Sequence, residues 1–144
     1  MDLQELIASG YGRIEGDYAH SYNCAERILN GANEVYGLGL DENSRHLACG
    51  FGAGLFVGST CGAVCAAAMV VGCLEAKDRL NQHQTPEIKE KLPRLLQQFQ
   101  AEAGSLLCSD LRPVYGEQSN CRPLLLKIAA LLDRYYAQGG NQNG

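Results

Sequence analysis

Apolar residues recur along this chain at the three- and four-residue spacing of amphipathic helices, and the alternation typical of strands is hard to find. One clear apolar face follows Asn23, and another follows Asn120 and runs to Tyr135. Asn23 with Glu26 three residues later resembles a capping box, which is a helix-start signal. The chain is therefore expected to be all-α, a compact bundle of about five helices.

Cap residues, prolines and glycines set the expected limits of the other helices. Proline directly after Thr85 marks one start, Pro93 is expected to interrupt or kink that helix, and Gly104 to stop it. A turn or short helix is expected around Cys108. The remaining expected helices cover residues 3–9, 41–48 and 86–103.

The helix expected from Cys61 to about Arg79 is unusual because small side chains keep it thin and almost no charge precedes Glu75. Such a helix is expected at the centre of the bundle, packed on all sides. A glycine-rich connector, residues 50–58, comes just before it. We expect the connector's glycines to let the chain approach the central helix closely.

The 144 residues suffice for one domain that folds without disulfides or metal as supports. No repeat or linker divides the chain, so a single helical domain is expected over residues 1–138. The tail, residues 139–144, contains only glycine, asparagine and glutamine. It has nothing to bury and is expected to be disordered.

The net charge of −4 and the lack of a basic patch argue against nucleic-acid and membrane-surface partners. The N-terminus is acidic and has no signal-peptide pattern, and glycines interrupt the longest nearly uncharged stretch, residues 47–74. We therefore expect a cytoplasmic protein without a membrane span. In that reducing compartment the seven cysteines are not expected to form a static disulfide framework.

Three cysteines, Cys24, Cys61 and Cys121, each directly follow an asparagine or threonine that is expected to cap a helix. The first position of a helix offers free N–H groups and the positive end of the peptide dipoles. That setting stabilises a thiolate and lowers the pKa of a cysteine. Because the thiolate attacks disulfides and binds metals, these three residues are candidates for the chemistry of the protein.

The other cysteines have different settings. Twelve residues separate Cys108 from Cys121, and the loop between them, with Pro113 and Gly116, is able to bring the two sulfurs together. The last three cysteines are expected to be small buried apolar residues, although one of them follows Cys61 by a single helical turn and is able to approach the site. These three are Cys49, Cys65 and Cys73.

His20 precedes Cys24 by four residues, and a protonated imidazole one helical turn away would favour its thiolate. If the helix starts only after His20, that geometry is lost, and an exposed histidine is the commoner outcome.

The cysteines stand in a familiar pattern of neighbours. The central motif is Cys61-Gly62-Ala63, preceded by Tyr22-Asn23-Cys24-Ala25 and followed by Gly104-Ser105-Leu106-Leu107-Cys108. In order and spacing these segments resemble the C-GCAxxG-C-C family of redox-active bacterial proteins, from about residue 17 to residue 135. The four cysteines of the family pattern are matched by Cys24, Cys61, Cys108 and Cys121.

The chain departs from the family motif at one position, because Ala66 stands where the motif ends in glycine. This change weakens any argument that the backbone at this residue must touch a cofactor. Related four-cysteine domains resemble the cluster-bearing part of the split-Soret cytochromes. The resemblance thus implies an iron–sulfur site in a redox domain, and a homodimer.

Three hypotheses for the function follow. The first is an iron–sulfur protein for electron transfer or redox sensing, in which the four motif thiolates hold a [2Fe-2S] or [4Fe-4S] cluster and a redox partner protein exchanges electrons. The alternative is thiol–disulfide chemistry without metal. The third is a structural four-cysteine zinc site or an inert bundle, although the short paired spacings usual for zinc are absent. Whether the protein is an enzyme, or an oxidoreductase component, stays open.

Overall fold

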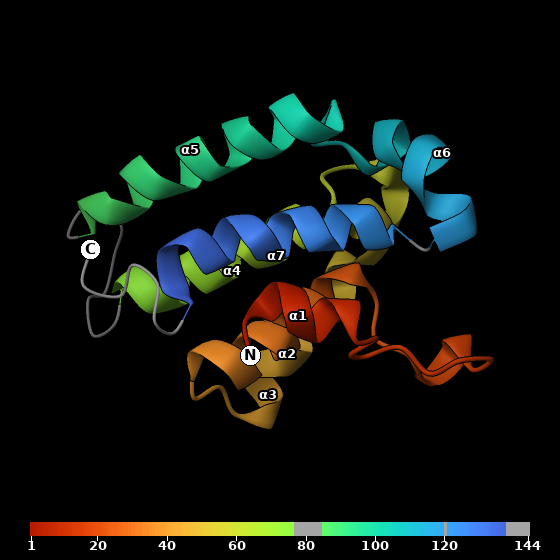
Figure 1. Ribbon diagram of the computed structural model, residues 1–144, viewed down its shortest axis with the longest axis horizontal. Helices are drawn as coiled ribbons and strands as arrows, with labels where there is room; N and C mark the ends of the chain where they lie inside the picture. Colours follow the sequence, from red (N-terminus) through yellow and green to blue (C-terminus); the bar gives the residue numbers. More distant parts are fainter. Residues whose placement is uncertain (77–84, 120, 138–144) are drawn as a thin grey trace.

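The computed structural model describes residues 1–76, 85–119 and 121–137, and these residues form a bundle of α-helices (Figure 1). Within them there is no strand, only an isolated bridge between Thr60 and Leu107. The expected tail, residues 139–144, lies outside the described residues, as does the expected end of the central helix. The helices are α1 (Leu3–Ala8), α2 (Cys24–Tyr36), α3 (Glu42–His46), α4 (Gly62–Ala76), α5 (Pro86–Ala103), α6 (Cys108–Ser119) and α7 (Arg122–Tyr136).

The all-α prediction is confirmed, with seven described α-helices rather than about five. Short helical turns supplement them: η1 (Tyr18–His20), η2 (Leu47–Phe51) and η3 (Gly54–Gly58). The main addition is α6, where only a turn or short helix was expected. None of the described helices is long and apolar enough to cross a membrane.

The capping box at the start of α2 is confirmed. The Asn23 side chain accepts a hydrogen bond from the Glu26 backbone N–H at 2.9 Å, and the Glu26 carboxylate accepts one from the Asn23 N–H at 2.9 Å. At the other end Gly37 takes the left-handed conformation, with φ of 67°, that glycine adopts without steric cost. The local sequence therefore fixes where α2 begins and ends.

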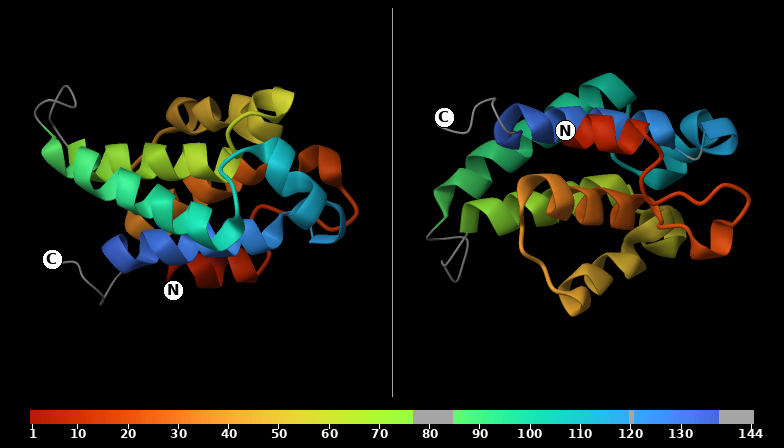
Figure 2. Two further views of the ribbon diagram at one scale, coloured as in Figure 1. Left: turned by 90° about the horizontal axis from the view of Figure 1, so that it is seen from above. Right: turned by 60° about the horizontal axis from the view of Figure 1, so that its bottom comes forward.

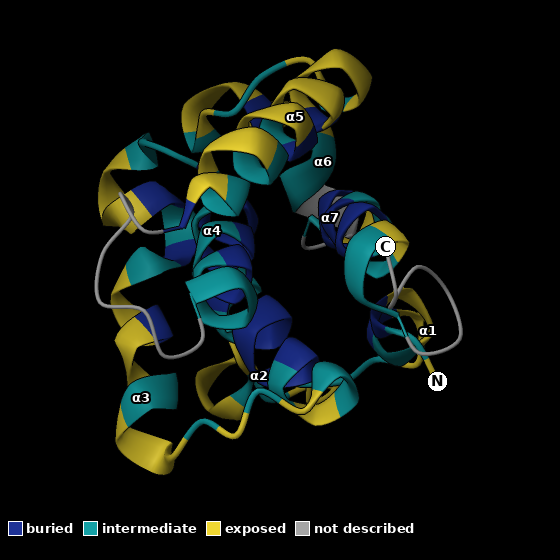
Figure 3. Ribbon diagram, turned by 90° about the vertical axis from the view of Figure 1, so that its left-hand side faces the viewer, coloured by how far each residue is buried: buried dark blue, intermediate teal, exposed yellow. Residues whose placement is uncertain are grey.

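The expected central helix is α4, which packs against α2, α5 and α7. Figure 3 shows the buried residues of α2, α4 and α7 turned towards the interior of the bundle. The expectation that α4 is packed on all sides is wrong, because one stripe along it is only half-buried. The stripe consists of Cys65, Ala68, Met69, Gly72 and Cys73.

Of the two effects expected of Pro93, an interruption or a kink, the interruption is absent, since α5 runs continuously through it to Ala103. A proline inside a helix removes one backbone hydrogen bond and costs about 3 kcal/mol. Burial of Leu95 and Phe99 on the next turns offsets this cost by anchoring α5 on the core. Gly104, at φ of 104°, ends the helix as expected.

The N-terminal segment closes the bundle on the side of α7. Leu3 and Ile7 of α1 are fully buried, and α1 packs against both α7 and α2 (Figure 2). After α1 the chain forms a long loop, residues 9–23, that extends to the end of the molecule where α6 and η3 lie (Figure 1). This end of the bundle carries the candidate site.

Candidate functional site

A cavity of about 450 Å³ opens at this end of the bundle, and all four motif cysteines line it. Its walls come from the start of α2, the start of α4, α6, and the loop of residues 9–23. The four residues are far apart in sequence, so only the tertiary fold brings them to one cavity. They are Cys24, Cys61, Cys108 and Cys121.

The expectation that three of these cysteines begin helices is confirmed only for Cys24, the first residue of α2. Cys61 lies just before α4, where its carbonyl accepts a hydrogen bond from the N–H of Cys65 at 3.0 Å. Cys121 likewise precedes α7 and has a left-handed backbone with φ of 60°. In their place, Cys108 is the first residue of a helix, α6.

The loop expected between Cys108 and Cys121 is instead the helix α6, which spans almost all of that interval. Both cysteines still face one cavity, because the chain turns back after the helix. The N–H of Cys121 donates to the carbonyl of Tyr115 at 3.1 Å, and its Sγ would lie 3.8 Å from a Cβ placed on Gly116. The expected convergence therefore occurs by a different route from the one inferred.

The glycine that follows Cys61 in the motif has a steric reason. A Cβ on Gly62 would lie 2.5 Å from the carbonyl oxygen of Phe51 and 2.6 Å from Sγ of Cys24. Gly54 of the connector is equally constrained, since a Cβ there would lie 2.6 Å from Cβ of Cys108. The connector does come close to α4, but at Gly62 of that helix, where the Phe51 carbonyl lies. The connector's own Gly54 lies instead against Cys108 of α6, so its glycines do not provide the expected approach to the central helix.

The connector also stores backbone strain beside the site. Four consecutive residues, 53–56, have φ between 50° and 62°, so they form a left-handed turn. Only Gly54 among them adopts this conformation freely; for Ala53, Leu55 and Phe56 it costs roughly 1–2 kcal/mol each. Such strain persists where the surroundings hold it, and it clusters at functional sites.

Burial raises the pKa of three of the thiols, contrary to the expectation of lowered values. For Cys61, burial raises the pKa to about 12, although the backbone N–H groups of residues 63 and 64 partly oppose it. Burial likewise raises the pKa of Cys24 and of Cys121. The dipoles at helix starts are present, but loss of water around a thiolate outweighs them.

The four thiols also lie within electrostatic reach of one another. Cys24 and Cys121 each contribute to the raised pKa of Cys61, and Cys108 contributes to that of Cys24. Among the described residues, however, no three His, Cys, Asp or Glu side chains are gathered to hold a single metal ion. The four thiols therefore line the cavity without being gathered around the position of a single ion.

The remaining cysteines lie outside this cavity. Cys49 is exposed, and its Sγ donates to a Glu26 carboxylate oxygen at 3.1 Å, so its expected role as a buried apolar residue is wrong. Cys65 is half-buried on α4, and burial raises its pKa, with a smaller contribution from Cys24. Cys73 is also half-buried, and burial alone raises its pKa.

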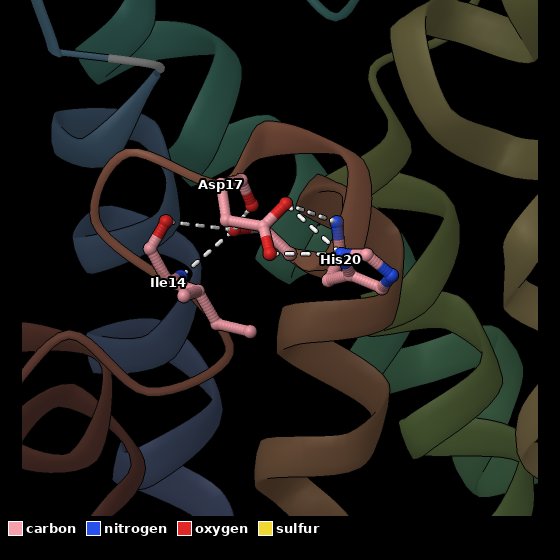
Figure 4. Close-up of polar contacts among 4 residues, drawn as sticks. Ile14, Asp17 and His20 are labelled. Atoms are coloured by element: carbon pink, nitrogen blue, oxygen red, sulfur yellow. Dashed lines mark hydrogen bonds and ion pairs between the residues drawn. The ribbon is translucent and has the colours of Figure 1, made fainter.

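His20 does not assist Cys24. Its Nδ1 lies 2.8 Å from an Asp17 carboxylate oxygen, and its side chain is 77% exposed (Figure 4). It belongs to η1, before α2 begins, so it is not one helical turn from Cys24. His20 is therefore an exposed histidine, the alternative given in the sequence analysis.

Sequence reasoning missed Arg27, which lines the cavity and is only 4% exposed. The available signal was its position in α2. Arg27 follows Cys24 by three residues, so both lie on the same side of the helix, and it directly precedes the apolar Ile28. A charged side chain near an otherwise apolar face is often buried for a purpose.

Comparison with known families agrees with this geometry. A protein-family model described as "putative redox-active protein (C_GCAxxG_C_C)" matches residues 22–135. The chain belongs to this family. The match covers all four motif cysteines and both glycines, Gly54 and Gly62, that lie against them. Neither the curated proteins nor the solved structures compared with the chain gave a match.

Proposed function

We propose that this family member is an iron–sulfur protein that serves in electron transfer or redox sensing. The observation that carries the proposal is the lining of one cavity by four cysteines from four separate parts of the chain. Four thiolates are the usual ligand set of [2Fe-2S] and [4Fe-4S] clusters, which supply reversible one-electron chemistry when bound.

The residues present fit such a group. The donors would be Cys24, Cys61, Cys108 and Cys121, and Gly62, which has no side chain, leaves room for Sγ of Cys24. Cys24, as the first residue of α2, also lies among free backbone N–H groups, which would stabilise negative charge on its sulfur.

Thiol–disulfide chemistry without metal has less support. A reactive thiol needs a substantial thiolate fraction near neutral pH. Burial instead favours the protonated form of Cys24, Cys61 and Cys121. Coordination to a metal would deprotonate such thiols, which is why their burial is compatible with ligation.

A structural zinc site also fits less well. Four-coordinate zinc needs sulfurs gathered tetrahedrally at about 2.3 Å from one ion. Among the residues that the structure describes, no group of three candidate ligands has that arrangement. A polynuclear cluster, in contrast, bridges ligands that are spread around a larger space.

The first experiment is anaerobic purification with a visible absorption spectrum and an iron and sulfide assay on the same sample. We expect a brown protein with sulfur-to-iron charge-transfer bands. These bands should be absent from the Cys61→Ser variant. The matched control is Cys73→Ser, because Cys73 lies on α4, the helix that directly follows Cys61, but outside the cavity.

A colourless protein that takes up no iron after reconstitution would contradict the proposal. If that protein also consumed a thiol reagent stoichiometrically and formed a disulfide, the metal-free alternative would replace it. Equal loss of iron in the Cys61 and Cys73 variants would mean that the effect is not specific to the cavity.

The proposal includes a redox partner protein and a homodimer in the cytoplasm, where thiols stay reduced. Next to the cavity, the turn η3 exposes apolar side chains: Leu55 is 43% exposed, Phe56 67% and Val57 79%. This apolar tip supports partner docking, and the half-buried stripe of small residues on α4 supports self-association. Sedimentation equilibrium of the wild type and of Ala68→Glu tests the dimer.

A further inference from the structure

The buried arginine of the cavity, Arg27, is held in one position by the loop above it. Its Nε donates to the carbonyl of Tyr11 at 2.9 Å. Gly12 of the same loop packs on its stem, since a Cβ there would lie 3.0 Å from Cγ of Arg27. The guanidinium is therefore preorganised, and its position does not depend on a ligand.

No carboxylate neutralises this cation in the described part of the chain, where the ion pairs involve other residues. The bond from Nε is the one hydrogen bond of its side chain there. Among the described residues, the side-chain nitrogen that is fully buried without a hydrogen-bond partner is Nε of Arg45. The terminal nitrogens of Arg27 are therefore not fully buried. Arg27 lines the cavity, so its guanidinium group is within reach of a ligand bound there.

Other cations lie near this arginine. Arg13, which pairs with Glu15 at 3.8 Å, and Arg112 also line the cavity, while the protein as a whole carries a net charge of −4. Burial lowers the pKa of Arg27, and the nearby charge of Arg13 lowers it further. Asp17 is the carboxylate among the described lining residues, and it is bonded to His20 (Figure 4).

A buried charge without a partner is costly, and so is a group of like charges. An anion in the cavity would remove both costs. The guanidinium fork binds carboxylates through two parallel hydrogen bonds, which a fixed Arg27 is ready to make.

The rest of the cavity suits an apolar body attached to that anion. Its volume of about 450 Å³ lies in the range of small-molecule sites. Much of the wall is aliphatic or aromatic, formed by Ile14, Tyr22, Leu111, Leu124 and Leu125.

We propose that the cavity binds a small organic carboxylate, with its carboxylate on Arg27 and its apolar part along this wall, beside the four thiols. The site shares the cavity with the proposed cluster but does not require iron. Its bound ligand would lie next to the redox centre and would be placed to act as a substrate or an effector of it.

The test is calorimetric titration of the whole protein, as purified anaerobically, with acetate, butyrate and hexanoate at low salt and neutral pH. Each added methylene should tighten binding by about threefold to fourfold, because it buries apolar surface. Hexanamide, which has the same body without the charge, should bind at least about tenfold more weakly than hexanoate.

Variants locate the site. Arg27→Met should weaken hexanoate binding by about tenfold to a hundredfold. Arg27→Lys should keep part of the affinity, because it keeps the charge but loses the fork. Arg112→Gln should weaken hexanoate binding less than Arg27→Met does. Because Arg112 is exposed on α6, its replacement leaves the contacts between Arg27 and the loop intact. The matched control is Arg94→Gln on the exposed side of α5, which should bind like the wild type.

Equal binding to the wild type and to Arg27→Met, equal binding of hexanamide, or no binding of hexanoate would each overturn the proposal. So would hexanoate binding only after iron removal, because the arginines would then serve only to balance the charge of the centre. An iron and sulfide assay on each sample separates this test from the proposed function: a protein without iron that binds hexanoate through Arg27 retains the carboxylate site.

Discussion

The polar groups at the two ends of the helical bundle differ in whether they have partners. At the end away from the cysteines, the Tyr36 hydroxyl donates to Asp133 at 2.6 Å, and the Tyr136 hydroxyl donates to Glu75 at 2.6 Å. Lys91 completes this network with an ion pair to Glu75 at 2.7 Å. At the cysteine end, burial raises the pKa of the thiols, and Arg27 has no carboxylate partner among the described residues.

The difference indicates which end of the bundle stabilises the fold and which end carries the function. Buried polar groups that are paired contribute to stability, whereas unpaired ones cost free energy. A protein keeps such a cost where function needs it. The left-handed turn at residues 53–56 adds to the cost at the cysteine end. The comparison yields four predictions, from the largest expected effect to the smallest.

The largest effect is expected at the paired end, in Asp133→Ala. The carboxylate of Asp133 accepts hydrogen bonds from the N–H of Leu3 at 2.8 Å and of Gln4 at 2.9 Å, besides the Tyr36 hydroxyl. Its removal leaves three donors without their acceptor and should lower the free energy of unfolding by about 4 kcal/mol. Urea denaturation measures this, and iron binding by the protein that remains folded should be unchanged.

The second prediction concerns pH and the metal-free protein. Because burial raises the pKa of Cys61 to about 12, the folded chain keeps this proton at a pH where the unfolded chain has lost it. The free energy of unfolding should be unaffected by this thiol below about pH 8.5 and should fall above it, by about 3 kcal/mol near pH 11. Urea denaturation as a function of pH should show a smaller fall in Cys61→Ser, and identical profiles would contradict the assignment.

The third prediction compares two glycines of α4. Gly62→Ala forces a Cβ against Phe51 and Cys24, so it should cost about 2 kcal/mol and reduce the iron content. In Gly72→Ala the new Cβ meets nothing within 4 Å, and the change should stabilise the helix by about 0.5 kcal/mol. Thermal unfolding and iron assays check both variants, and equal effects would show that Gly62 has no special place beside the thiols.

The smallest effect is expected from Tyr36→Phe, which removes a single hydrogen bond to Asp133. It should lower the free energy of unfolding by about 1 kcal/mol, because Asp133 keeps its backbone donors. Tyr18→Phe is the matched control, since Tyr18 is 85% exposed. A loss as large as that of Asp133→Ala would mean that the tyrosine, not the N-terminal helix, depends most on this carboxylate.

Local signals predicted the helices well where capping groups are adjacent in sequence. The start of α2 followed from Asn23 and Glu26, and the end of α5 from Gly104. Prediction failed where distant contacts override local preference. Pro93 lies inside α5 because the following turns bury Leu95 and Phe99.

The candidate site shows the same division. The resemblance to the family selected the four cysteines that line the cavity, but their helix positions were mostly misjudged. The lowered pKa expected for Cys61 was wrong because burial cannot be inferred from a cap residue. Arg27 was not recognised, since its loop partner Tyr11 is sixteen residues away in the sequence.

The sequence by itself therefore determined the all-α class, the caps of individual helices and the family motif, because these depend on side-chain spacing and on neighbours within a few residues. Only the tertiary structure decided that the four thiols share one cavity, that burial raises the pKa of Cys24, Cys61 and Cys121, and that Arg27 lines the same cavity. Those properties arise from contacts between segments far apart in the chain, where the loss of water and the lack of a partner carry more free energy than local preference.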